Sequence, residues 1–200
     1  MASEHCTDLA KSGLTRASIA AQFIRSVPPS LIGRLLGFDV PGIRSALLFP
    51  FRSPAGGFMN HVRVKIFPPL QNAAGHTVKY LQPKDTSPRV YFVAACLADV
   101  LTGPQPLWCV EGEKKAVAVA QLGLPAIGFC GVEGWHVKGD RRLLPDFDAL
   151  RLQDRVVELI PDGDYQTNPD VKRAIQRFGS ALAMRGARPR VVLLPSELAR

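Results

Sequence analysis

The chain has 200 residues, of which 46% are hydrophobic and 21% are charged, a composition that can bury a substantial core in one domain or two small ones. It contains no uninterrupted apolar run of about 18 residues, so we expect no membrane-spanning helix. The first residues also lack the basic-then-apolar layout of a signal peptide.

The net charge of +8 is distributed unevenly along the chain. Residues 1–100 carry 11 basic and 5 acidic side chains, whereas residues 101–200 carry 14 and 12. An excess of this kind favours contact with a polyanion through the first half. An ordinary basic surface is the alternative that charge alone leaves open.

The cysteine pattern argues against a structural zinc site. Cys6, Cys96, Cys109 and Cys130 are scattered, and none forms a Cys-x-x-Cys pair, so a zinc ribbon is not encoded. Buried thiols without a disulfide framework are typical of a reducing compartment. We therefore expect a cytoplasmic protein.

The first predicted element is a helix that follows Thr15. Threonine is a favourable helix cap, and the apolar spacing predicts a helix over Arg16–Arg25. Its inner side would present Ile19, Phe23 and Ile24. We expect this opening segment to be a packing or interaction element that contributes no catalytic residue.

A second short helix is predicted over Ser30–Leu36, ended by Gly37. Residues 45–94 then change character to short apolar runs separated by Pro- and Gly-rich turns, which favours a small antiparallel sheet. The predicted strands are Ala46–Phe51, His61–Phe67, Thr77–Leu81 and Val90–Val93.

After a polar link at residues 95–105, strands and helices alternate. Such alternation predicts a parallel, Rossmann-like α/β sheet. The predicted elements are a strand at Leu107–Val110, a helix at Glu113–Leu122, a strand at Ala126–Cys130, a helix at Asp146–Leu152, a strand at Arg155–Ile160, a helix at Asp170–Arg185 and a strand at Arg190–Leu194.

Three carboxylates follow two of these predicted parallel strands. Glu111 ends the first, and Asp162 and Asp164 follow the third. The carboxyl ends of strands in an open α/β sheet are where ligands bind. Three carboxylates gathered there would repel one another without a cation, and oxygen-only ligands suit Mg²⁺ or Mn²⁺.

The spacing of these carboxylates requires a particular arrangement of strands. Asp162 and Asp164 point the same way in extended chain because one residue separates them. Glu111 joins them only if the first and third parallel strands are neighbours. It would then be a metal ligand or a general acid/base. The alternative is a plain Asp-Gly-Asp turn, with Glu111 as a helix cap.

Several nearby side chains are further candidates, each with a structural alternative. Lys114 and Lys115 would neutralise a phosphate beside the metal or form a solvated face. Asp170 would be an additional metal ligand or cap a helix. Trp135 and His136 would stack on a base, or belong to a turn built around a buried tryptophan.

The Glu-Gly segment and the Asp-x-Asp segment resemble the TOPRIM domain of bacterial-type primases, topoisomerases and some nucleases. A fuller resemblance is to a TOPRIM-like family of plasmids, phages and integrated elements, on residues 111–116 (Glu-Gly-Glu-Lys-Lys-Ala) and 131–135 (Gly-Val-Glu-Gly-Trp). It implies a four-stranded, mainly parallel TOPRIM sheet at residues 105–200, preceded by a small basic α+β subdomain at residues 1–104.

The first half is similar, more distantly, to the catalytic core of bacterial replicative primases. Leu47–Phe51, Arg63 and Lys79–Pro83 follow the order seen there. The resemblance implies that Lys79 and Arg63 contact nucleotide or template; an exposed strand lysine is the alternative for Lys79. Residues 82–85 read Gln-Pro-Lys-Asp where that family has an Asn-Ser-Pro turn, so nucleotide-specific contacts do not carry over.

The resemblance implies a metal-dependent enzyme of a mobile element that performs primase-type nucleotidyl transfer. Glu111, Asp162 and Asp164 would be the catalytic metal ligands, with Mg²⁺ or Mn²⁺ as cofactor. Single-stranded DNA and nucleoside triphosphates would be partners, and a replicative helicase is a further candidate. The chain lacks a Gly-x-x-x-x-Gly-Lys-Ser/Thr loop and so has no ATP motor of that type. A TOPRIM nuclease and a non-catalytic binding module are the alternatives.

Overall fold

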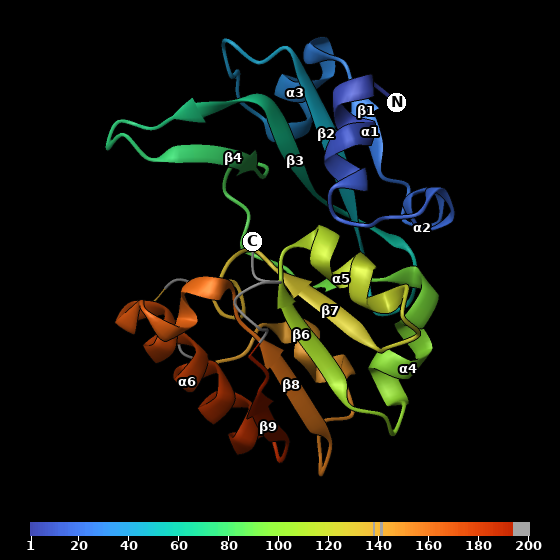
Figure 1. Cartoon of the computed structure of the whole chain (residues 1–200), viewed down its shortest axis with the longest axis vertical. Coiled ribbons are helices and arrows are strands. Elements are labelled where there is room, and N and C mark those ends of the chain that lie inside the picture. The colour runs from blue at the N-terminus through green and yellow to red at the C-terminus, as the bar shows by residue number, and fades with distance from the viewer. Residues whose placement is uncertain (138, 141, 194–200) are drawn as a thin grey trace. The chain divides into compact units, whose positions relative to one another are not determined.

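The computed structural model in Figure 1 describes residues 1–137, 139–140 and 142–193, and only the backbone of Asp164. The chain divides into two compact units. The N-terminal unit comprises residues 1–52 and 57–87, and the C-terminal unit comprises residues 53–56 and 88–200. In the part of the chain that is described, no helix is long and apolar enough to cross a bilayer.

The N-terminal unit is built on an antiparallel sheet with the strand order β1-β2-β3-β4. Three of these strands were predicted, whereas β1 is too short to give a periodic signal. The strands are β1 (Arg25–Val27), β2 (Ser45–Arg52), β3 (Phe58–Gln71) and β4 (Thr77–Leu81), and the helices are α1 (Ser3–Ala10), α2 (Arg16–Ala21) and α3 (Pro29–Leu36).

One face of this sheet forms an apolar core with α3. Alternation along β2 and β3 turns Ala46, Leu48 and Val64 to the same face, where they pack with Ile32 and Leu36 of α3. Proline at the start of α3 and a left-handed glycine directly after its end set the limits of this helix. The prediction for this helix is confirmed.

The other face of the sheet holds α1 through polar contacts. The buried His5 ring lies 2.7 Å from the Ser26 hydroxyl and 3.0 Å from the Ser45 hydroxyl, and Asp8 pairs with Lys65. Burial lowers the pKa of His5, so the neutral ring is favoured between the two hydroxyls. These contacts explain why a polar N-terminal segment folds onto the sheet.

Helix α2 differs from its prediction at its C-terminal end. The Thr15 hydroxyl accepts the Ser18 N–H at 3.2 Å, as expected of a cap, but the helix ends at Ala21. Phe23 has a φ of 56° and is 52% exposed, so the prediction that it packs on the inner side of a longer helix is wrong.

The C-terminal unit is built on a five-stranded mixed sheet with the order β5-β7-β6-β8-β9. Strands β7, β6, β8 and β9 are labelled in Figure 1. Four strands run parallel, and β5 pairs antiparallel with β7. The strands are β5 (Tyr91–Phe92), β6 (Leu107–Glu111), β7 (Ala126–Phe129), β8 (Val156–Ile160) and β9 (Arg188–Val191). The helices are α4 (Leu97–Thr102), α5 (Glu113–Ala120) and α6 (Pro169–Met184), with 3₁₀ turns η1 (Ala94–Cys96), η2 (Pro145–Ala149) and η3 (Gly163–Gln166).

Three expectations for this region are corrected. The predicted four-stranded sheet has a fifth strand, because β5 pairs here and not with the N-terminal sheet. The link at residues 95–105 contains α4, and the helix expected at residues 146–152 is the 3₁₀ turn η2. Residues 88–104 lie in the C-terminal compact unit. The predicted domains, residues 1–104 and 105–200, are a separate assignment from these compact units and stay a prediction.

Two buried charges tie residues 88–104 into the C-terminal unit. The Asp146 carboxylate accepts hydrogen bonds from Arg89 Nε at 2.9 Å and from the Val90 N–H at 3.0 Å. Arg155 donates to the carbonyls of Asp99 at 2.6 Å and Val100 at 2.5 Å. Burying either charge without these partners would cost several kcal/mol, roughly 3–5 for a broken buried pair.

The topology of the parallel strands creates a switch point between β6 and β8. From β6 the chain passes through α5 to β7, whereas from β8 it passes through α6 to β9 on the other side. Right-handed crossovers in opposite directions place α5 and α6 on opposite faces of the sheet. Two consecutive residues of β7 contact these two helices from opposite faces of the sheet. Gly128 lies against α5, and the Phe129 ring contacts Phe178 of α6 with ring centroids 5.2 Å apart.

The close approach of α5 to β7 depends on Gly128. A Cβ atom there would lie 2.8 Å from the Gly112 carbonyl oxygen and 3.1 Å from the Ala116 Cβ. Gly179 in α6 is a contrasting position, since a Cβ there would meet its neighbours at an ordinary 3.8 Å.

We predict that Gly128→Ala lowers the free energy of unfolding by about 1–3 kcal/mol, the usual cost of overpacking. Gly179→Ala should leave it unchanged or raise it by about 0.5–1 kcal/mol, because alanine is the better helix former. Urea unfolding followed by the fluorescence of Trp108 and Trp135, both in the C-terminal unit, measures the difference. Equal effects of the two substitutions would refute the proposed packing constraint.

Candidate functional site

The two predicted acidic segments meet at the carboxyl edge of the parallel sheet. Strands β6 and β8 are neighbours, with Val110 paired to Ile160, which confirms the predicted adjacency. Glu111 ends β6 and Asp162 lies just beyond β8. The Glu111 Oε1 atom accepts the Asp162 N–H at 3.5 Å, so residues 51 positions apart in sequence are in contact.

The Asp162 carboxylate is paired with the ammonium group of Lys115, from the first turn of α5. Both side chains are about half exposed, at 54% for Lys115 and 45% for Asp162. An ion pair this exposed contributes about 0–1 kcal/mol and exchanges readily. Lys115 therefore contacts the acidic edge directly, and Lys114 beside it is partly buried.

The turn between β6 and α5 holds Glu111 in place. Gly112 has a φ of 93°, a conformation that side chains rarely adopt, and its N–H donates to the Phe129 carbonyl at 2.8 Å. Glu113 follows in the first turn of α5, where a carboxylate is favoured by the helix dipole, and it is buried at 2% exposure.

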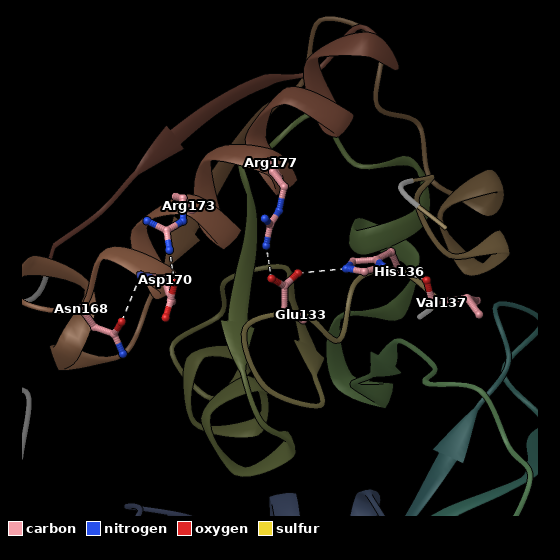
Figure 2. Close-up of polar contacts among 7 residues, drawn as sticks. All are labelled: Glu133, His136, Val137, Asn168, Asp170, Arg173 and Arg177. Atoms are coloured by element: carbon pink, nitrogen blue, oxygen red, sulfur yellow. Dashed lines mark hydrogen bonds and ion pairs between the residues drawn. The ribbon is translucent and has the colours of Figure 1, made fainter. Parts of the chain in front are cut away.

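The remaining predicted metal ligands lie at the start of α6 or before it. The Asp164 side chain lies outside the described part of the structure. Asp170 is largely exposed and pairs with Arg173 (Figure 2). Its N–H is held at 3.0 Å by the side chain of Asn168, which is the cap of α6. Asp170 as a metal ligand stays a prediction.

Two of the predicted metal ligands, Glu111 and Asp162, meet at this edge, and a metal site there stays a prediction. Among the described side chains, no group of three or more His, Cys, Asp or Glu residues could hold a metal ion. Glu111 and Asp162 offer oxygen donors on neighbouring strand ends, and a cationic ammonium group already contacts one of them. That donor set suits Mg²⁺ or Mn²⁺, which retain water ligands.

A second polar cluster follows the carboxyl end of β7. Figure 2 shows the Glu133 carboxylate between Arg177 of α6 and His136. The His136 Nε2 atom lies 2.9 Å from Glu133 Oε2, and its Nδ1 atom lies 2.8 Å from the Val137 carbonyl oxygen. Sequence analysis missed this cluster, because Glu133 and Arg177 are 44 residues apart.

Trp135 is a core residue, so of the two predicted roles the buried one is correct. It is 2% exposed and stacks on Phe178 with ring centroids 5.2 Å apart. Its neighbour His136 is partly exposed and lines a cavity of about 330 Å³. The lining residues are Glu133, Trp135, His136, Gly139, Asp140 and Arg177.

The contacts of His136 favour its protonated form. Burial by itself would lower the pKa of this imidazole, but the hydrogen bonds to Glu133 and to the Val137 carbonyl outweigh it, so the pKa is raised. Both ring nitrogens face acceptors, which only the imidazolium can satisfy as a double donor. The hydrogen bond between His136 and Glu133 is therefore charge-assisted when His136 is protonated.

We predict a pH-dependent contribution of this cluster to stability. Because the folded pKa lies above the ordinary value of 6.5, the stabilisation is present below that value and is lost as pH rises through the folded pKa. Glu133→Gln should therefore lower the free energy of unfolding more at about pH 5.5 than at about pH 8.5. Urea unfolding at both pH values measures this.

Asp148→Asn is the matched control, since Asp148 pairs with Arg185 and involves no histidine in that contact. Its effect should be similar at the two pH values. If Glu133→Gln behaved in the same way as this control, His136 would have no part in the coupling.

The two basic candidates of the N-terminal unit lie on opposite faces of its sheet. Tyr80 pairs with Lys65 and shares a face with Arg63, whose guanidinium lies 4.8 Å from the Tyr80 ring centroid. Lys79 is exposed and, by the alternation of β4, points to the face of Leu81. The two residues therefore do not form one basic cluster.

Residues 98–200, just over half of the chain, match the family model described as "Domain of unknown function (DUF3854)". The chain belongs to the DUF3854 family. The description of this family names no activity, and its model covers the strand-helix repeats with Glu111 and Asp162. No match was found among curated proteins.

Among solved structures, this DUF3854 protein is similar to the zinc-binding and RNA polymerase domains of the Aquifex aeolicus primase. The TM-score is 0.61 at 14% sequence identity, and the alignment covers 97% of this chain and 50% of the primase chain. At that identity the likeness shows a shared fold. The chain spans about half the length of that primase structure.

Proposed function

We propose that this protein is a metal-dependent nucleic-acid enzyme that joins nucleotides on single-stranded DNA, with a TOPRIM-like C-terminal unit. The observation that carries the proposal is the meeting of Glu111 and Asp162 at the switch point between β6 and β8. Ligands of open α/β sheets bind at such points. The fold shared with a bacterial primase supports the same reading.

Glu111, Asp162 and Asp164 would hold Mg²⁺ or Mn²⁺. When bound, such an ion stabilises charge on phosphoryl oxygens. The chain supplies the rest of the chemistry. Lys115, released from Asp162, would pair with a phosphate of the incoming nucleotide. The Glu111 carboxylate, as the alternative to binding metal, would accept the proton of the attacking hydroxyl group, whose oxygen bonds to the α-phosphorus of the nucleoside triphosphate while pyrophosphate leaves.

The N-terminal unit would hold the template. Lys79 and Arg63 would contact phosphates from the two faces of the sheet, and nucleoside triphosphates would be the second substrate. A replicative helicase partner and a mobile-element origin rest on the sequence resemblance alone.

The experiment incubates the protein with single-stranded DNA, labelled nucleotides and Mg²⁺ or Mn²⁺. We predict short labelled products, reduced on the order of 100-fold or more by Asp162→Asn and by Glu111→Gln, because each removes charge stabilisation at the reacting phosphate. Asp148→Asn removes a carboxylate paired with Arg185 and should retain the activity.

Other outcomes would replace the proposal. Shortening of the template, lost in the same two variants, would identify a nuclease. Binding of DNA without products or cleavage would identify a non-catalytic module. Products that survive both substitutions would place the chemistry elsewhere.

A further inference from the structure

An exposed aromatic pair lies at one end of the N-terminal sheet. Phe23 is 52% exposed and Phe58 is 51% exposed, and their rings meet edge to face with centroids 5.1 Å apart. The Arg52 guanidinium carbon lies 4.3 Å from the Phe58 centroid and 5.7 Å from the Phe23 centroid. We call Phe23, Arg52 and Phe58 the aromatic platform.

Phe23 occupies a position that normally favours glycine. Its N–H donates to the Ala20 carbonyl at 3.0 Å, and the Ile24 N–H donates to the Ile19 carbonyl at 3.1 Å. This is the Schellman arrangement that ends a helix with one left-handed residue. A bulky side chain with a φ of 56° is strained there, and its exposed ring recovers little by burial. Strain of this kind is a pointer to function.

Arg52 connects the two rings into a single unit. It pairs with Phe58 across the β2–β3 hairpin, which brings its guanidinium over that ring. Its Nη2 atom also donates to the Ala21 carbonyl at 3.0 Å, at the end of α2. The cation therefore fixes the distance between the Phe58 strand and the Phe23 turn.

The platform belongs to a unit with a basic excess, and Arg25 lies beside it. The N-terminal unit contains 10 Lys and Arg residues against 4 Asp and Glu residues. Arg25, exposed at the start of β1, is adjacent to the platform, and its Nη1 atom lies 3.5 Å from the Phe23 carbonyl oxygen. Exposed aromatic rings beside cations match the chemistry of single-stranded nucleic acids, which pair stacked bases with a phosphate backbone.

We propose that the aromatic platform stacks bases of single-stranded DNA, with Arg25 on a neighbouring phosphate. This inference rests on the proposed function and deepens it, since it names where the unpaired strand is held. Phe23 and Phe58 are each about half exposed, and an exposed aromatic ring offers a surface on which a base can stack. A protein partner fits less well, because a stable protein interface needs a far larger patch than two rings.

The test is a fluorescence-anisotropy titration with a labelled oligothymidylate in EDTA, so that binding needs no divalent ion. We predict that the double variant Phe23→Asn/Phe58→Ala weakens binding about tenfold or more, as expected for lost base stacking. Asparagine tolerates the left-handed conformation, so relief of strain at residue 23 offsets the lost contact between Arg52 and Phe58, and the thermal unfolding temperature should change little. Phe23→Tyr/Phe58→Tyr should retain the affinity, as should Leu31→Ala, which trims another exposed apolar side chain.

Two further measurements separate stacking from charge. An abasic oligonucleotide of the same length should bind the wild type and the double variant equally. Arg25→Gln should lower the slope of log K against log salt by about one, whereas the double variant should leave that slope unchanged. Crosslinking of 5-bromodeoxyuridine-containing DNA to Phe23 or Phe58 would locate the contact directly.

Unchanged oligothymidylate affinity in the double variant would overturn the proposal, and so would a wild type that fails to bind it. If instead the double variant lost only the ability to bind another protein, the platform would be a protein-docking surface. The titration is repeated with Asp162→Asn, a variant that changes the proposed metal site and leaves the aromatic platform intact. This separates the proposal of nucleotide joining from the proposal of base stacking. Failure of nucleotide joining with intact, platform-dependent DNA binding would refute the enzyme and keep the platform.

Discussion

The structure depends on one constraint, the adjacency of two parallel strands whose following helices leave in opposite directions. Because β6 and β8 are neighbours, Glu111 and Asp162 reach one sheet edge although 51 residues separate them. Helices α5 and α6 cover opposite faces, and in open α/β sheets ligands bind at the edge between two such helices. Gly112 and Gly128 allow the tight turn and the close packing of α5 that this arrangement needs.

The N-terminal unit is stabilised differently on the two faces of its sheet. Its antiparallel sheet buries one face against α3 and covers the other with α1 through His5, Asp8 and Lys65. At the end of the sheet near Arg52, the rings of Phe23 and Phe58 are about half exposed, and the backbone of Phe23 is strained. The two units thus differ in their side chains as the charge distribution suggested: Glu111 and Asp162 lie in one, and the basic excess and the exposed aromatic pair lie in the other.

Sequence reasoning succeeded where local periodicity and topology rules suffice. It located the parallel strands of the second half and the adjacency that joins Glu111 to Asp162. It failed where the signal is short or tertiary. The strand at Val90–Val93 was predicted, but its pairing with β7 in the second sheet was not. The end of α2 lacks the glycine that would have marked it, so the apolar pattern continued through Phe23. The contact between Glu133 and Arg177 comes from packing that no local pattern encodes.

The most direct test of the account is divalent-cation binding itself, measured as Mn²⁺ binding by electron paramagnetic resonance. The account predicts saturable binding by the wild type, unchanged in Asp148→Asn and weakened about tenfold or more in Asp162→Asn and in Glu111→Gln, since each loses a charged oxygen ligand. Absence of Mn²⁺ binding by the wild type, or equal binding by all four proteins, would contradict a metal site at the carboxyl ends of β6 and β8.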